Sequence, residues 1–117
     1  LGLDATNIID NTTSARDMGV LLEKIYRGEV TDKALTRELL DFMRDTLFED
    51  RLARDLPDGV VVYHKAADAV TMVHDAGIID DGKNPFVLTV LTTDMVSEEH
   101  AKEKIGALAK FIYEQRN

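Results

Sequence analysis

The side chains that could serve as a catalytic nucleophile are few in this sequence. It has no cysteine, and its only serines are Ser14 and Ser97. A serine nucleophile needs a base within hydrogen-bond reach, such as the lysine of a Ser-x-x-Lys pair, and neither serine belongs to such a pair. Each serine instead stands just before a helical pattern, where its hydroxyl would cap the first turn. The sequence therefore predicts no positioned nucleophile in this chain.

Two histidines could share a metal ion if they lay side by side. His64 and His74 fall in neighbouring segments that are typical of strands. In a hairpin that turns near residues 67–68, His74 would lie across from about Val61 and away from His64. The pair His74-Asp75 could orient a general base, but the chain offers no nucleophile for that base to activate. We therefore expect no metal ion and no cofactor.

Two helical patterns occupy the first part of the chain. Ser14 is a good N-cap, Asp17 could complete a capping box, and Gly28 ends the helix; its apolar residues are Met18, Leu21, Leu22 and Ile25. A second helix begins near residues 31–32, and its apolar side carries Leu35, Leu39, Phe42, Met43 and Leu47. The short connection predicts a packed helical pair. Polar residues 49–58 then lead to Pro57, where a helix cannot continue.

The residue composition of the sequence changes after Gly59. Residues 60–64, 69–79 and 86–92 are rich in β-branched and aromatic residues, and they predict three antiparallel strands. Apolar residues on both faces of these strands require cover on both sides, from the helical pair and from a last helix that begins at Ser97. The acidic loop at 80–84 lacks the twelve-residue calcium pattern and is typical of a solvated turn.

Composition excludes several classes of partner. A formal net charge of −8 would repel a phosphate backbone, and no basic patch is visible, so we expect no nucleic acid. No apolar run approaches the roughly 20 residues of a membrane span. The chain starts at Leu1, and its first ten residues resemble the interior of a longer sequence, so we interpret it as a fragment or a processed product.

The ordered set of segments resembles the C-terminal part of a class A serine β-lactamase. Residues 11–18 (Asn-Thr-Thr-Ser-Ala-Arg-Asp-Met) resemble the start of the helix that follows the omega loop in that family. Residues 56–65 resemble the approach to its Lys-Thr/Ser-Gly strand, and residues 74–79 and 85–92 its next two strands. The resemblance implies an α+β fold with a helical pair, a three-stranded antiparallel sheet and a C-terminal helix. It also implies one domain over residues 1–117, helical at 11–55 and with the sheet and terminal helix at 56–117.

The resemblance also implies a substrate-binding segment at residues 65–68. Lys65 stands where the family holds the substrate carboxylate, although a lysine at the end of a strand can also simply discourage aggregation. Ala66 replaces a hydroxyl, Ala67 replaces a glycine that lets substrate lie close, and Asp68 falls where the family supplies an oxyanion-hole N–H. The nucleophile and its bases precede the matched residues in the family. We therefore expect no catalytic residue and no activity in this chain alone.

Three interpretations remain open from the sequence. The first is part of an extracellular or cell-surface bacterial hydrolase that acts on β-lactams or cell-wall peptides. The second, favoured by Ala66 and Ala67, is a non-catalytic binding domain on the same scaffold, and the third is an unrelated small domain. For the first two, the strand at residues 86–91 would have a free edge, which predicts a homodimer or pairing with an N-terminal part of the parent protein.

Overall fold

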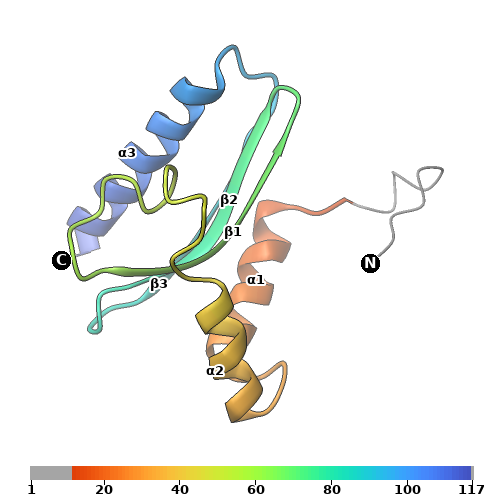
Figure 1. Ribbon diagram of the computed structural model, residues 1–117, viewed down its shortest axis with the longest axis vertical. Helices are drawn as coiled ribbons and strands as arrows, with labels where there is room; N and C mark the ends of the chain where they lie inside the picture. The colour runs from red at the N-terminus through yellow and green to blue at the C-terminus, as the bar shows by residue number, and fades with distance from the viewer. Residues whose placement is uncertain (1–11, 117) are drawn as a thin grey trace.

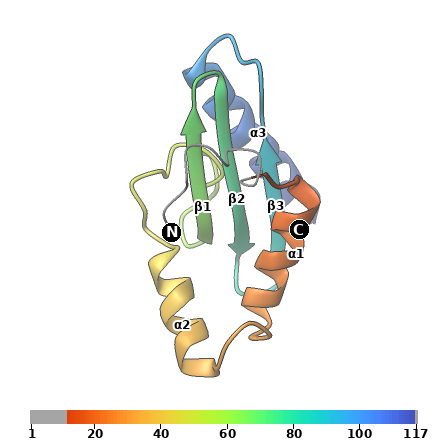
Figure 2. The same ribbon diagram turned by 90° about the vertical axis from the view of Figure 1, so that its right-hand side faces the viewer.

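The computed structural model describes residues 12–116, in which two layers of helix enclose a sheet (Figures 1 and 2). The elements are α1 (Ala15–Tyr26), α2 (Lys33–Phe42), β1 (Val61–Ala69), β2 (Met72–Asp80), β3 (Phe86–Leu91) and α3 (Glu98–Arg116). The predicted α+β fold is confirmed. Residues 1–10, which we interpreted as the interior of a longer sequence, lie outside the described range.

Local hydrogen bonds set the ends of α1. The Ser14 hydroxyl accepts a hydrogen bond from the Asp17 N–H, and Gly28 takes the positive φ of 73° that ends the helix. Leu22 and Ile25 are buried, as predicted. Leu21, which belongs to the same apolar spacing, is 44% exposed.

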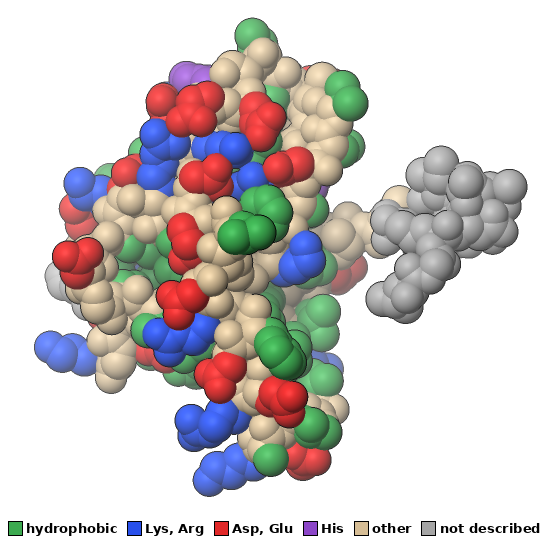
Figure 3. All heavy atoms as spheres, in the orientation of Figure 1, with side chains coloured by type: hydrophobic (Ala, Val, Ile, Leu, Met, Phe, Trp, Pro, Cys, Tyr) green, Lys and Arg blue, Asp and Glu red, His purple; other side chains and the backbone are tan. Residues whose placement is uncertain are grey.

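The orientation of α2 differs from the prediction. Asp32 caps the helix, as expected, but Leu35 and Phe42 are exposed, and Leu47 lies beyond the end of the helix. The only buried residue of α2 is Thr36. The two helices form a pair but touch little, since α1 packs chiefly on β2 and β3. Leu39 and Met43 are half-buried, and Met43 packs against the core on the α1 face, but the rest of the predicted apolar side is exposed. Hydrophobic side chains are accordingly visible at the surface over α2 (Figure 3).

The three strands form an antiparallel sheet in the order β1-β2-β3. The first hairpin turns at Val70 and Thr71, where Thr71 has a φ of 63°, and not near residues 67–68 as predicted. His74 is consequently paired with Ala67, and His64 with Gly77. The prediction failed because this turn contains no glycine, proline or asparagine, the residues that mark turns in a sequence.

Both faces of the sheet are covered, as predicted. On one face Leu22 of α1 packs with Ala76 and Ile78, and on the other Ile105 and Ala109 of α3 pack with Val62. The connection at residues 49–58, predicted to be a polar loop, also covers the α3 face and buries Arg51 and Leu52. That segment therefore brings the charged side chain of Arg51 into the interior, where it pairs with Asp50 and Asp68.

Candidate functional site

The segment that the sequence singled out, residues 65–68, is regular strand at the far end of β1. Side chains alternate between the two faces of a strand. Lys65 and Ala67 therefore share the α1 face with Tyr63, whereas Ala66 and Asp68 share the α3 face with Val62. Lys65 is exposed, and its Nζ donates to the Ala66 carbonyl at 2.6 Å. The four residues are thus brought together but divided between two faces.

The outer edge of β1 carries unpaired backbone groups beside Lys65. In an antiparallel strand, alternate N–H groups point to opposite sides. The His64 N–H points outward, because it donates to the Met43 carbonyl at 2.7 Å, so the N–H groups of Ala66 and Asp68 point outward too. Neither donates to a residue in the described range. A ligand along this edge would meet free backbone donors next to a lysine.

Asp68 is bound to a buried arginine on the α3 face. Two guanidinium nitrogens of Arg51 reach its two carboxylate oxygens, one at 2.9 Å, and the arginine side chain is only 1% exposed. The hydrogen bond from Arg51 holds the pKa of Asp68 below its usual value. Burial alone would lower the pKa of Arg51, but its bonds to Asp68 and Asp50 outweigh burial and raise it. The carboxylate is thus charged, neutralised by Arg51 and turned away from Lys65.

A second buried ion pair lies directly before Lys65. His64 is fully enclosed, with its Nδ1 2.8 Å from Asp75 and its Nε2 2.6 Å from Glu49. Burial alone would lower the pKa of His64, but the hydrogen bonds to Asp75 and then Glu49 outweigh it and raise the pKa. The other Asp75 oxygen accepts from the Leu52 N–H at 3.2 Å. The pair therefore fastens the 49–52 segment to the sheet.

Sequence reasoning missed both ion pairs. It considered His74-Asp75, but His74 accepts a hydrogen bond from the Thr92 N–H through Nδ1, and Asp75 turns to His64 instead. The sequence did contain one sign of a large buried side chain at this place, a glycine inside a strand pattern. A Cβ at Gly77 would lie 2.8 Å from the Cβ of His64, so the glycine makes room for the buried imidazole.

The two serines are engaged in helix caps. The Ser14 hydroxyl accepts from the Asp17 N–H, and the Ser97 hydroxyl accepts from the His100 N–H at 3.2 Å, so both predicted caps are confirmed. Within residues 12–116 no group of three or more His, Cys, Asp or Glu side chains is arranged so that it could hold a metal ion. Over the same residues, no helix has the length and hydropathy needed to cross a membrane.

Comparison with solved structures identifies the class of protein. The structure of PBP-A superimposes with a TM-score of 0.85 at 25% identity, over 99% of this chain and 44% of that one. An extended-spectrum β-lactamase, TLA-1, matches at 28% identity with a TM-score of 0.78, over 87% and 41%. A β-lactamase from Sphaerobacter thermophilus, at 17% identity and a TM-score of 0.79, covers 84% and 38% and shares the fold. The fold is the one found in this part of class A β-lactamases and PBP-A.

The sequence profile of the Beta-lactamase enzyme family matches residues 1–115, and the chain belongs to that family. A search of curated protein sequences gave no match. The chain spans less than half the length of the solved structures that it matches.

Proposed function

We propose that this chain is the C-terminal portion of a bacterial serine hydrolase of the β-lactamase family. The parent protein would carry out acyl chemistry on β-lactams or cell-wall peptides, at the cell surface or outside the cell, where those substrates occur. The observation that carries this proposal is the open outer edge of β1. There Lys65 would attract a substrate carboxylate, and the Asp68 N–H would donate to a developing oxyanion.

The chain by itself is catalytically incomplete in this proposal. Both of its serine hydroxyls accept hydrogen bonds from helix N-termini, and neither has a lysine three residues later. An acyl-enzyme needs an activated nucleophile, which an N-terminal part of the parent protein would supply. The 117-residue chain would then contribute the strand that orients the substrate.

A direct test is labelling with a fluorescent penicillin, together with hydrolysis of a chromogenic cephalosporin. The chain alone should show neither, because no hydroxyl is positioned to attack. Intact-protein mass spectrometry would detect any adduct. An acylated Ser14 or Ser97 would contradict the proposal.

A non-catalytic binding domain on the same scaffold is the second candidate, and the composition of β1 favours it. Ala66 offers no hydroxyl to a carboxylate, and Ala67 adds an exposed methyl group beside Lys65 where the family has a glycine. The double change Ala66→Thr and Ala67→Gly in the parent protein separates the two candidates. A faster acylation rate supports a weak enzyme, whereas a parent with no acylation before or after the change is a binder.

The edge of β3 is the surface where we propose that a partner strand adds. In the parent this partner would be a strand from the N-terminal part, and in the isolated chain a second copy. Phe86–Leu91 is apolar and contains no lysine or proline that would discourage pairing. The hydrogen-exchange rates of its backbone amides test this proposal.

A further inference from the structure

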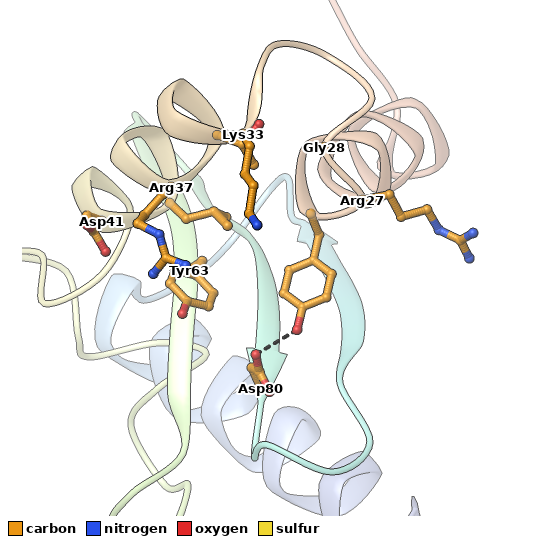
Figure 4. A pocket seen from close by; sticks show the side chains of 10 residues that line it. Arg27, Gly28, Lys33, Arg37, Asp41, Tyr63 and Asp80 are labelled. Carbon is orange, nitrogen blue, oxygen red and sulfur yellow. Dashed lines mark hydrogen bonds between the residues drawn. The ribbon is translucent and has the colours of Figure 1, made fainter.

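A cavity of about 470 Å³ opens between the two N-terminal helices and the sheet, at the other end of β1 from residues 65–68. Tyr26 and Gly28 line it from the end of α1, and Lys33 and Arg37 from α2. Its floor is Tyr63 of β1 and Asp80 of β2 (Figure 4). The volume is within the usual range for small-molecule sites.

The face of α2 that borders the cavity is cationic where an apolar face is expected. Lys33, Thr36, Arg37 and Leu40 follow the spacing of one helical face, and Thr36 is the only buried residue of α2. The apolar Leu35 is 51% exposed on another side. In Figure 4 the Lys33 ammonium reaches into the opening, and the Arg37 guanidinium lies beside Tyr63.

The charges of Lys33 and Arg37, whose side chains are exposed to water, are weakly unfavourable to each other in the absence of a ligand. Like charges four residues apart on a helix destabilise it by a few tenths of a kcal/mol. Lys33 is also the first residue of α2, where the helix dipole is positive. Neither side chain forms a hydrogen bond or an ion pair with any residue between 12 and 116. An anion would relieve both effects.

Other charged and polar groups that line the cavity already have partners of their own, which leaves Lys33 and Arg37 free to bind a ligand. The Asp80 carboxylate accepts from the Tyr26 hydroxyl at 2.7 Å and from the Gly82 N–H at 2.8 Å, so both its oxygens are engaged. Burial, and then the bond to Asp80, raises the pKa of Tyr26 to about 12, which keeps the phenol a donor. Arg27 points away from the cavity and pairs with Glu23 at 2.9 Å (Figure 4).

We propose that this cavity binds a small oxyanion, a phosphate or a carboxylate group, between Lys33 Nζ and the Arg37 guanidinium. Charge-assisted hydrogen bonds from these two groups would hold the oxygens. The cavity is larger than a phosphate, so it also has room for an organic portion packed against Tyr63 and Leu40. Asp41 lies beyond Arg37, which confines the anion to the Lys33 side.

Backbone NMR titration of the 117-residue chain tests this site, with inorganic phosphate in one arm and succinate in the other at constant ionic strength. We expect saturable shifts of the Thr36, Arg37 and Tyr63 amides, and the stronger arm identifies the anion class. The double change Lys33→Gln and Arg37→Gln should weaken binding about tenfold or more. Arg27→Gln is the matched control, because Arg27 lines the same cavity but points away, and it should bind as the wild type does.

Asp41→Asn provides a second test, in which we expect a gain in anion affinity. This test does not depend on whether the Lys33→Gln and Arg37→Gln double variant folds. Removal of this negative charge beside Arg37 should strengthen binding. The proposal is overturned if neither anion gives a saturable shift, or if Arg27→Gln weakens binding as much as the double change. Unchanged or weaker binding by Asp41→Asn would overturn it as well.

Discussion

His64 is a buried cation held between two carboxylates, and its charge depends on pH. Its pKa is raised above 6.5 in the folded state, so the folded protein binds this proton more tightly than the unfolded chain does. The resulting stabilisation is complete below about pH 6.5 and is lost as the pH rises through the folded pKa. Loss of the proton would leave Asp75 buried without its cation.

We predict that the free energy of unfolding falls as the pH rises above about 6.5. His64→Gln should abolish this decline and cost about 3 kcal/mol near pH 6, because it leaves a buried carboxylate unpaired. Urea denaturation at a series of pH values measures both effects. His100→Gln is the control, since His100 is exposed on α3 and should keep the wild-type profile. Stability that is constant or rises over this interval in the wild type would contradict the assignment.

The Arg51–Asp68 pair is asymmetric, because the arginine is buried and the carboxylate is 36% exposed. Asp68→Asn would leave a buried guanidinium without its main partner, and should cost about 2 to 3 kcal/mol. Arg51→Met leaves a carboxylate that water can reach and fills the site with an apolar chain, so we predict a smaller loss. Thermal unfolding of the two variants under the same conditions shows which one loses more stability. The reverse order would show that the carboxylate, and not the arginine, is the group that needs compensation.

At the scale of elements, α1 packs against β3 at Gly19. A Cβ at Gly19 would lie in ordinary van der Waals contact with β3, 3.8 Å from the Thr89 Oγ1. That hydroxyl is buried against the helix and has no hydrogen-bond partner in the described part of the protein. A buried polar atom without a partner destabilises the folded state, whereas a methyl group of the same shape does not.

We therefore predict that Thr89→Val raises the free energy of unfolding by about 1 kcal/mol. Chemical denaturation measures the change, and Thr93→Val, at an exposed position after β3, should have little effect. A destabilised Thr89→Val variant would indicate that the hydroxyl finds a partner in solution, such as a bridging water or the strand that we propose to add at this edge.

At the scale of the whole molecule, the two edges of the sheet differ. The segment before β1 partly covers its edge through the Met43 carbonyl. The same alternation of N–H groups assigns the amides of Val87, Thr89 and Leu91 to the free edge of β3, and those of Phe86, Leu88 and Val90 to pairing with β2. An apolar edge with free donors favours strand addition.

We predict a dimer of the isolated chain, with the amides of Val87, Thr89 and Leu91 protected from hydrogen exchange. The alternate amides of β3 are an internal control, because pairing with β2 protects them in monomer and dimer alike. Light scattering gives the mass, and exchange followed by NMR gives the protection of each residue. A monomer in which only the alternate amides are protected would show that the edge tolerates water.

The sequence by itself determined the features that depend on neighbouring residues. Caps at Ser14 and Ser97, the helix end at Gly28 and the three strand segments rest on hydrogen bonds and side-chain spacing within a few positions. The order of these segments was also enough to recognise the β-lactamase family. The same local signals predicted the buried faces of α1 correctly at Leu22 and Ile25.

Only the tertiary structure decided the pairings between distant residues. The ion pairs of Arg51 with Asp68 and of His64 with Asp75 join positions 17 and 11 residues apart. They depend on the register of the first hairpin, and the residues of the Val70–Thr71 turn do not predict that register. A register shift of one residue would move every side chain of a strand to the other face of the sheet. The sequence did not reveal the orientation of α2 either, because its apolar residues suggested a core face. In the structure Leu35 and Phe42 are exposed, and Lys33 and Arg37 line the cavity beside the sheet. Register and helix rotation are set by packing summed over the whole fold, so the sequence pattern of any one segment could not determine them.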